Sequence, residues 1–124
     1  MMELMIVVVI VAVLIALAYP SYVQYMRKAK RSEAQQLLMN WSINQEIWRS
    51  NHTTYDDGTN ITEPQLDDYD FVVSNTSATT YTLTAEAEND QLNDKAKDGT
   101  YCGKPGSLLQ MTQTGAKTPA ACWD

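Results

Sequence analysis

The chain has 124 residues, of which 44% are hydrophobic and 19% are charged, and its formal net charge is −6. That length allows one small domain and excludes a protein of several packed domains. After Arg31 the sequence holds fourteen acidic residues and five basic ones. This acidic balance argues against tight, nonspecific binding of DNA through overall charge.

An apolar segment begins the chain. Residues 4–19 are all apolar, with Glu3 before them and Pro20 after them. As a helix this run would be roughly 24 Å long, slightly less than the ~30 Å core of a bilayer. We therefore expect the segment to lie in lipid or against copies of itself. A carboxylate beside such a run needs a partner, which makes Glu3 a candidate functional residue.

The helix is predicted to continue well beyond this segment. No Gly or Pro occurs between Pro20 and Asn51. Apolar residues recur there at helical spacing, namely Ala34, Leu37, Leu38, Trp41 and Trp48. Because Pro20 removes one helical hydrogen bond, we expect it to bend the helix. The prediction is one helix of about 50 residues whose apolar stripe can seat a sheet.

A polar loop and a small sheet are predicted to follow. Residues 51–70 are rich in Thr, Asp and Asn, which indicates a long loop. Strands are expected at 71–73 and 81–87 with a turn at 75–78 between them, because the second segment alternates apolar and polar residues. A third strand is expected at 108–112, and a short fourth at 116–118. The predicted fold class is α+β, with one long helix on a three- or four-stranded antiparallel sheet.

Two cysteines, Cys102 and Cys122, lie in the last quarter of the sequence. They can form a disulfide or remain as two buried free thiols. A disulfide would contribute on the order of 3 kcal/mol to a head whose core is small. It would also require an oxidising compartment.

Little in the sequence indicates catalysis. The one histidine, His52, lies in the polar loop, and no nucleophile with a matching base can be assembled. Acidic residues gather at 56–70 and 90–98 without the spacing of a helix-loop-helix calcium site. We therefore predict a protein that is not an enzyme, with no cofactor and no metal site.

The N-terminal residues resemble those of a known family. The order ELMIVV from Glu3, then Ala16, Ala18, Pro20 and a basic stretch ending at Arg31, is similar to the start of class a type IV pilins. These pilins form thin filaments on bacterial surfaces and share this region with the pseudopilins of type II secretion. The family usually begins Phe-Thr-Leu-Ile-Glu, so we expect that the first mature residues and a basic leader are missing here.

The C-terminal residues resemble the same family independently. Cys102-Gly103, the segment QTGAKTP at 113–119 and Cys122-Trp123 are similar to the disulfide region of type IV pilins in the PilE-like group. The resemblance implies a pilin fold with a Cys102–Cys122 disulfide loop. It also implies a hydrophobic stalk at 1–25 and a head at 26–124, with a loop at 51–70, a sheet at 71–118 and the disulfide region at 102–122.

The resemblance further implies how the protein is assembled. The stalk residues expected to act in assembly are Glu3, Leu4, Val8, Leu14 and Pro20. The expected partners are other copies in a helical filament, the inner membrane before assembly, and the pilus assembly machinery. The head would be periplasmic before assembly and extracellular in the pilus.

Two functions follow from this resemblance. The first is a structural subunit of a type IV pilus, serving adhesion, motility or DNA uptake. The alternative is a low-abundance minor pilin that acts as a DNA or surface receptor, for which four lysines and two aromatic residues of the disulfide region are suggestive: Lys95, Lys97, Lys104, Lys117, Tyr101 and Trp123. Asp90, Asp94 and Asp98 lie among them, which predicts a mixed, solvated surface and at most weak DNA binding. A type II secretion pseudopilin is disfavoured because that group commonly lacks the cysteine pair.

Overall fold

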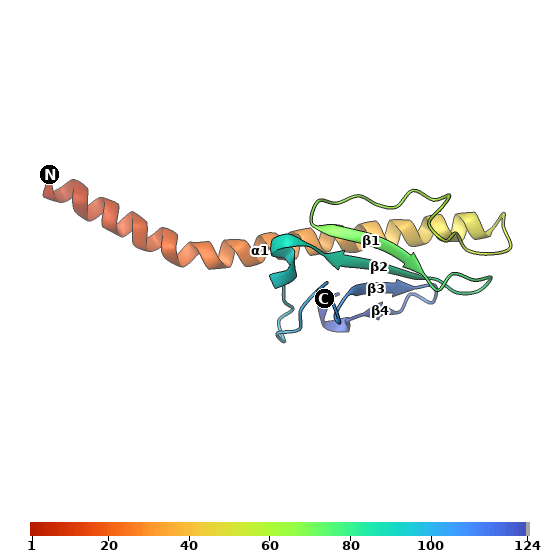
Figure 1. The fold of residues 1–124 in the computed structure, drawn as a ribbon. Helices are drawn as coiled ribbons and strands as arrows, with labels where there is room; N and C mark the ends of the chain where they lie inside the picture. Colours follow the sequence, from red (N-terminus) through yellow and green to blue (C-terminus); the bar gives the residue numbers. More distant parts are fainter. Residues whose placement is uncertain (124) are drawn as a thin grey trace.

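A computed structural model describes residues 1–123 as a long helix with a small sheet packed on its C-terminal half (Figure 1). Helix α1 spans Met2–Arg49. The strands are β1 (Tyr69–Ser74), β2 (Thr82–Ala87), β3 (Leu109–Thr112) and β4 (Lys117–Thr118). Two short 3-10 helices, η1 (Asn89–Asn93) and η2 (Ala120–Cys122), flank the strands β3 and β4 in sequence. The predicted α+β class and its single long helix are confirmed.

Helix α1 changes its environment along its length. Its N-terminal half projects beyond the head, and its C-terminal half lies along the sheet (Figure 1). The ribbon bends near the point where the projecting part meets the head, in the region of Pro20. The helix continues through Pro20, so the expected bend occurs without a break in the element.

The sheet is an antiparallel meander with strand order β1-β2-β3-β4. Phe71 is opposite Ala85, Leu83 is opposite Met111, and Gln110 is opposite Thr118. The four predicted strands are therefore confirmed, and no bound differs by more than two residues. The first starts at Tyr69, so the connection after α1 is slightly shorter than expected.

The core lies between α1 and one face of the sheet. Ala34, Leu38 and Trp41 of the helix are buried, as the helical spacing predicts. From the sheet, the buried side chains include those that alternation assigned to one face of the second strand: Tyr81, Leu83, Ala85 and Ala87. Trp48 differs from the expectation. It is half-buried at the end of the stripe and stacks on His52, with ring centroids 3.7 Å apart.

The long connection between α1 and β1 is anchored at one aspartate. The Gln45 amide donates to the Asp56 backbone carbonyl and accepts from the Asp56 N–H, both at 3.0 Å. The Asp56 carboxylate in turn accepts hydrogen bonds from the backbone N–H groups of Gly58, Asn60 and Ile61. These bonds give the connection a fixed shape although it contains no helix or strand.

Candidate nucleic-acid interface

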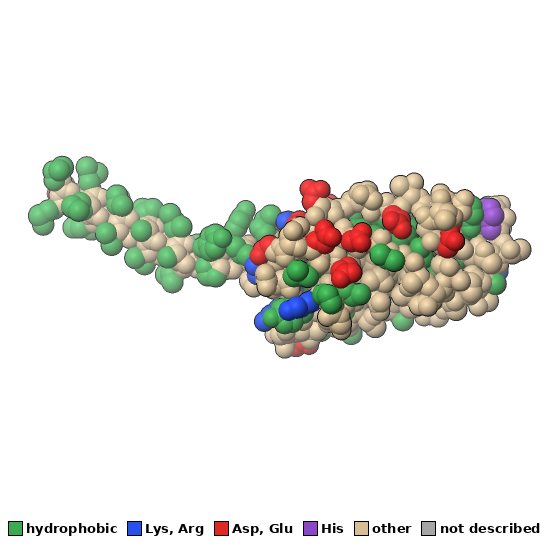
Figure 2. All heavy atoms as spheres, in the orientation of Figure 1, with side chains coloured by type: hydrophobic (Ala, Val, Ile, Leu, Met, Phe, Trp, Pro, Cys, Tyr) green, Lys and Arg blue, Asp and Glu red, His purple; other side chains and the backbone are tan. Residues whose placement is uncertain are grey.

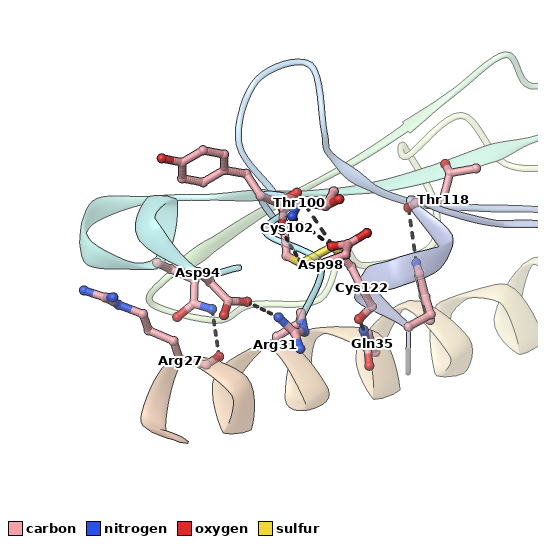
Figure 3. Close-up of a disulfide and its surroundings, with 12 residues drawn as sticks. Arg27, Arg31, Gln35, Asp94, Asp98, Thr100, Cys102, Thr118 and Cys122 are labelled. Atoms are coloured by element: carbon pink, nitrogen blue, oxygen red, sulfur yellow. Dashed lines mark hydrogen bonds and ion pairs between the residues drawn. A yellow bond between two sulfur atoms is a disulfide. The ribbon is translucent and has the colours of Figure 1, made fainter. Parts of the chain in front are cut away.

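A disulfide organises the C-terminal part of the head. Cys102 and Cys122 are bonded and buried, with their Cα atoms 5.7 Å apart, which confirms the disulfide (Figure 3). The loop that it closes contains β3 and β4. Gln35 of α1 donates to the Cys122 carbonyl at 2.6 Å, so the helix also holds the disulfide in place.

Three ion pairs join α1 to the sheet side of the head. Arg31 donates to Asp94 at 2.7 Å, and both side chains are almost fully buried (Figure 3). Burial raises the pKa of the Asp94 carboxyl above its usual range, although the Arg31 guanidinium opposes that shift. Nearer the stalk, Arg27 makes two hydrogen bonds to Asp90, and Lys30 pairs with Asp68. Most of the basic cluster of the helix is therefore paired with acids of the head.

These ion pairs change the charge of the disulfide region. Sequence position alone mixes Asp90, Asp94 and Asp98 with the lysines. In the structure the first two carboxylates pair with Arg27 and Arg31 of α1. Asp94 is thereby buried, whereas Asp90, paired with Arg27, and Asp98 stay exposed near four lysines: Lys95, Lys97, Lys104 and Lys117. The surface therefore carries both signs of charge, with the lysines in excess.

The rest of the head has the opposite charge. Residues 51–94 contain ten acids and no Lys or Arg. Figure 2 shows acidic side chains spread over the face of the head, including the end where the stalk begins, and most basic side chains in this view lie at that same end. Acidic side chains therefore occur over the whole head, whereas most of the basic ones lie near one end of it.

Two aromatic rings lie among the lysines. The ammonium groups of Lys95 and Lys104 lie 4.4 and 4.5 Å from the centroid of the Tyr101 ring. The hydrogen bond and charge of Lys95, together with the charge of Lys104, lower the pKa of the Tyr101 hydroxyl. Lys117 lies 5.0 Å from the Trp123 ring, whose Nε1 donates to the Thr118 carbonyl. Half-buried rings beside ammonium groups can contact both the bases and the phosphates of a nucleic acid strand.

A cleft of about 330 Å³ lies where this region meets the helix. Its lining includes Lys28 and Arg31 of α1 and Lys95, Lys97 and Asp98 of the disulfide region. Sequence reasoning did not place Lys28 and Arg31 at this site. A signal for Arg31 was present, because Arg27 and Arg31 continue the helical spacing of Ala34, Leu38 and Trp41.

The predicted assembly residues lie apart from this region. Glu3, Leu4, Val8, Leu14 and Pro20 all belong to the projecting half of α1, and each is exposed. Among the described residues, α1 is the one helix whose length and composition would let it cross a membrane. Glu3, Leu4, Val8 and Leu14 lie away from the head, whereas Pro20 lines a pocket with Arg27 and Asp90. The role of these residues in assembly stays a prediction.

The acidic loops do not converge on one point. Across residues 1–123, no group of three or more His, Cys, Asp or Glu side chains could hold a metal ion. Asp56 binds backbone N–H groups of its own loop, and Asp98 accepts from the Thr100 N–H at 2.9 Å.

Comparison with solved structures assigns the fold. A type IV pilin from Shewanella oneidensis superposes with a TM-score of 0.59 at 22% sequence identity, covering 79% of this chain and 98% of that one. The class of the protein is therefore a type IV pilin fold: a long helix, a four-stranded antiparallel sheet and a C-terminal disulfide.

Comparison with family models identifies the group. The model described as "Type IV minor pilin ComP, DNA uptake sequence receptor" matches residues 20–105. The chain belongs to this family of type IV minor pilins. No curated protein matches the chain. The family and the fold are those of structural proteins rather than of enzymes.

Proposed function

We propose that this chain is a minor type IV pilin that binds DNA through the basic surface of its disulfide region. The observation that carries the proposal is the clustering of Lys95, Lys104 and Lys117 around Tyr101 and Trp123. Cations that neutralise phosphates supply affinity, and aromatic rings add contacts to bases. The description of the family, which names a DNA uptake sequence receptor, supports the same reading.

Ion pairs within the head weaken the main objection to DNA binding, which is its acidic charge. The acids of residues 51–94 would repel DNA if they shared its binding surface. However, Asp94 is buried against Arg31, and the exposed Asp90 is paired with Arg27. Among the described residues of this region, Asp98 is left as an exposed acid without a paired cation. A strand lying along the disulfide region would therefore meet mostly positive charge.

The test is DNA binding by the full chain in detergent, measured over a range of salt concentrations. Lys95→Gln/Lys104→Gln should weaken binding and reduce the slope of log K against log salt by about 2, because each phosphate contact contributes ~0.9. Lys95→Arg/Lys104→Arg is the matched control, since it keeps both charges. Equal affinity of the parent and the Gln variant would contradict the proposal.

The stalk supports a second role for the same molecule, as a subunit within a filament. Its apolar side chains are exposed in the isolated chain; Leu4, Val8 and Leu14 are 69%, 67% and 61% exposed. Such a surface must be covered by lipid before assembly and by neighbouring stalks afterwards. We propose that the protein is held in the inner membrane with a periplasmic head, and that the pilus assembly machinery then moves it into an extracellular filament.

Glu3 is the residue proposed to drive this assembly. A carboxylate among apolar side chains is costly unless a partner neutralises it, and the N-terminal amine of a neighbouring subunit would do so. Glu3→Val should insert into membranes as the parent does but be depleted from sheared pili, as measured by immunoblotting. Recovery of the variant in pili at the parent level would count against this role.

A further inference from the structure

Three tyrosines follow the apolar run of the stalk. Tyr19, Tyr22 and Tyr25 are 68%, 63% and 72% exposed, and Tyr19 lines a pocket with Arg27 and Asp90 at the edge of the head. Exposed tyrosines at the end of an apolar helix are typical of the boundary between a bilayer core and its headgroups. They indicate how deeply the stalk sits in the membrane.

The rise of the helix per residue then gives the distance of the following residues from the bilayer core. At 1.5 Å per residue, residues 4–23 span about 30 Å, the thickness of a bilayer core. Lys28 is five residues further along α1, about 7 Å beyond the core, and so lies within the headgroup layer. Arg31 lies about one helical turn further from the bilayer core than Lys28.

The basic cleft lies at this same height. Its lining combines Lys28 of the helix with Lys95 and Lys97 of the disulfide region. None of these three lysines forms an ion pair with a residue in the described part of the chain. Arg31 is neutralised by Asp94, and Asp98 is the one other acid in the lining. The cleft therefore carries a surplus of positive charge.

We infer that this cleft binds the phosphate of an anionic phospholipid while the stalk is in the membrane. The inference rests on the membrane stage of the proposed function. Lys28, Lys95 and Lys97 would surround the headgroup phosphate, and each lysine near an anionic surface favours the bound state. The lipid would fix the head at one orientation on the bilayer and hold the segment around Lys95 and Lys97 against α1.

Position favours lipid over DNA as the occupant of this cleft. Figure 2 shows basic side chains gathered beside the base of the stalk, where a bilayer surface would face them. Lys117, by contrast, lies 4.0 Å from Met39, and Met39 is about 16 Å further along the helix than Lys28. The basic surface of the disulfide region therefore extends away from the membrane, whereas the cleft is at its membrane end.

The test is hydrogen exchange of the full chain in nanodiscs of zwitterionic lipid, with or without phosphatidylglycerol. Backbone amides of residues 95–101 should exchange about threefold or more slowly when phosphatidylglycerol is present. Lys28→Gln/Lys97→Gln should abolish this dependence on lipid charge. Lys104→Gln/Lys117→Gln, which removes two charges outside the cleft, should retain it.

The results that would contradict the lipid site can be told apart from those that would contradict the proposed function. Equal exchange in both kinds of disc, or an unchanged dependence in Lys28→Gln/Lys97→Gln, would overturn the lipid site and leave the proposed function intact. Equal protection by inorganic phosphate in zwitterionic discs would identify a site for free anions and overturn it as well. A chain that did not enter the discs would overturn the membrane stage itself and the inference with it.

Discussion

Arg31 brings a positive charge into the core of the head, where Asp94 lies opposite it. The two side chains are 5% and 1% exposed, and their atoms are 2.7 Å apart. The backbone carbonyl of Asp94 also accepts from the N–H of Cys102 at 3.0 Å. Asp94 therefore connects the helix to the disulfide through its side chain and its backbone. It also directly precedes Lys95 of the basic surface.

Breaking that buried pair should be costly. Arg31→Met leaves Asp94 buried without its partner, which should reduce the free energy of unfolding by about 3–5 kcal/mol. Burial already raises the pKa of Asp94, so the loss should shrink at acidic pH, where the carboxyl is neutral. Denaturant unfolding of Arg31→Met, of Asp94→Leu and of the double variant Arg31→Met/Asp94→Leu measures this loss. If the double variant were as unstable as Arg31→Met, the unpaired charge would not be the cause.

Asp56 should make the fold sensitive to acid. Burial raises the pKa of its carboxyl, but hydrogen bonds from the Asn60 side chain and from the N–H groups of Ile61, Asn60 and Gly58 outweigh it, so the pKa is lowered. An Asp pKa that is lower in the folded state contributes stability above the unfolded value of about 3.9, and that stability is lost as pH falls through the folded value. Unfolding measured from neutral pH to acid should show this loss, and Asp56→Asn should show less of it. Asp57→Asn, in the neighbouring exposed residue, should keep the parent's profile; an unchanged profile in Asp56→Asn would contradict the account.

At the scale of elements, the loop closed by the disulfide contains short elements that need support from the rest of the head. β4 has two residues, both exposed, and η2 has three. Strands of this length cannot hold themselves in place by pairing alone. The Cys102–Cys122 bond and the hydrogen bond from Gln35 therefore fix Lys117 and Trp123 relative to Tyr101.

Removing the disulfide should loosen this region first. In the chain-entropy model, a bond that joins residues 20 apart in sequence contributes about 3 kcal/mol. Cys102→Ser/Cys122→Ser should therefore melt at a lower temperature and bind DNA more weakly than the oxidised parent, as seen by calorimetry and by titration. Reduction of the parent should reproduce both effects. Identical melting of the variant and the oxidised parent would show that the bond adds nothing to stability.

At the scale of the whole molecule, the proposed functions use two separate surfaces. The exposed apolar half of α1 projects away from the head and is available to lipid or to other stalks (Figure 1). The basic surface lies around the disulfide, and the remaining head is acidic. The proposed assembly depends on residues 1–25 and the proposed DNA binding on residues 95–123, so we expect a change in one segment to leave the other function intact.

Much of this architecture could be predicted from sequence, because it depends on local patterns. The helical spacing of apolar residues predicted the burial of Ala34, Leu38 and Trp41. The alternation of apolar and polar residues predicted which face of β2 is buried. The ion pairs of Arg27 and Arg31 could not be found in this way, because their partners lie 63 residues away. The excess of lysines that these pairs leave around the disulfide could therefore not be predicted from the order of the residues. Which acids remain exposed depends on the tertiary fold rather than on their neighbours in sequence.

The most direct test of the central claim is a footprint of duplex DNA on the full chain by hydrogen exchange. The account predicts slower exchange at residues 95–104 and 117–123, with no change in the acidic connection at 51–68. The footprint should disappear in Lys95→Gln/Lys104→Gln at DNA concentrations that saturate the parent. Protection centred on 51–68, or none at the disulfide region, would contradict the claim that this surface is the DNA-binding site.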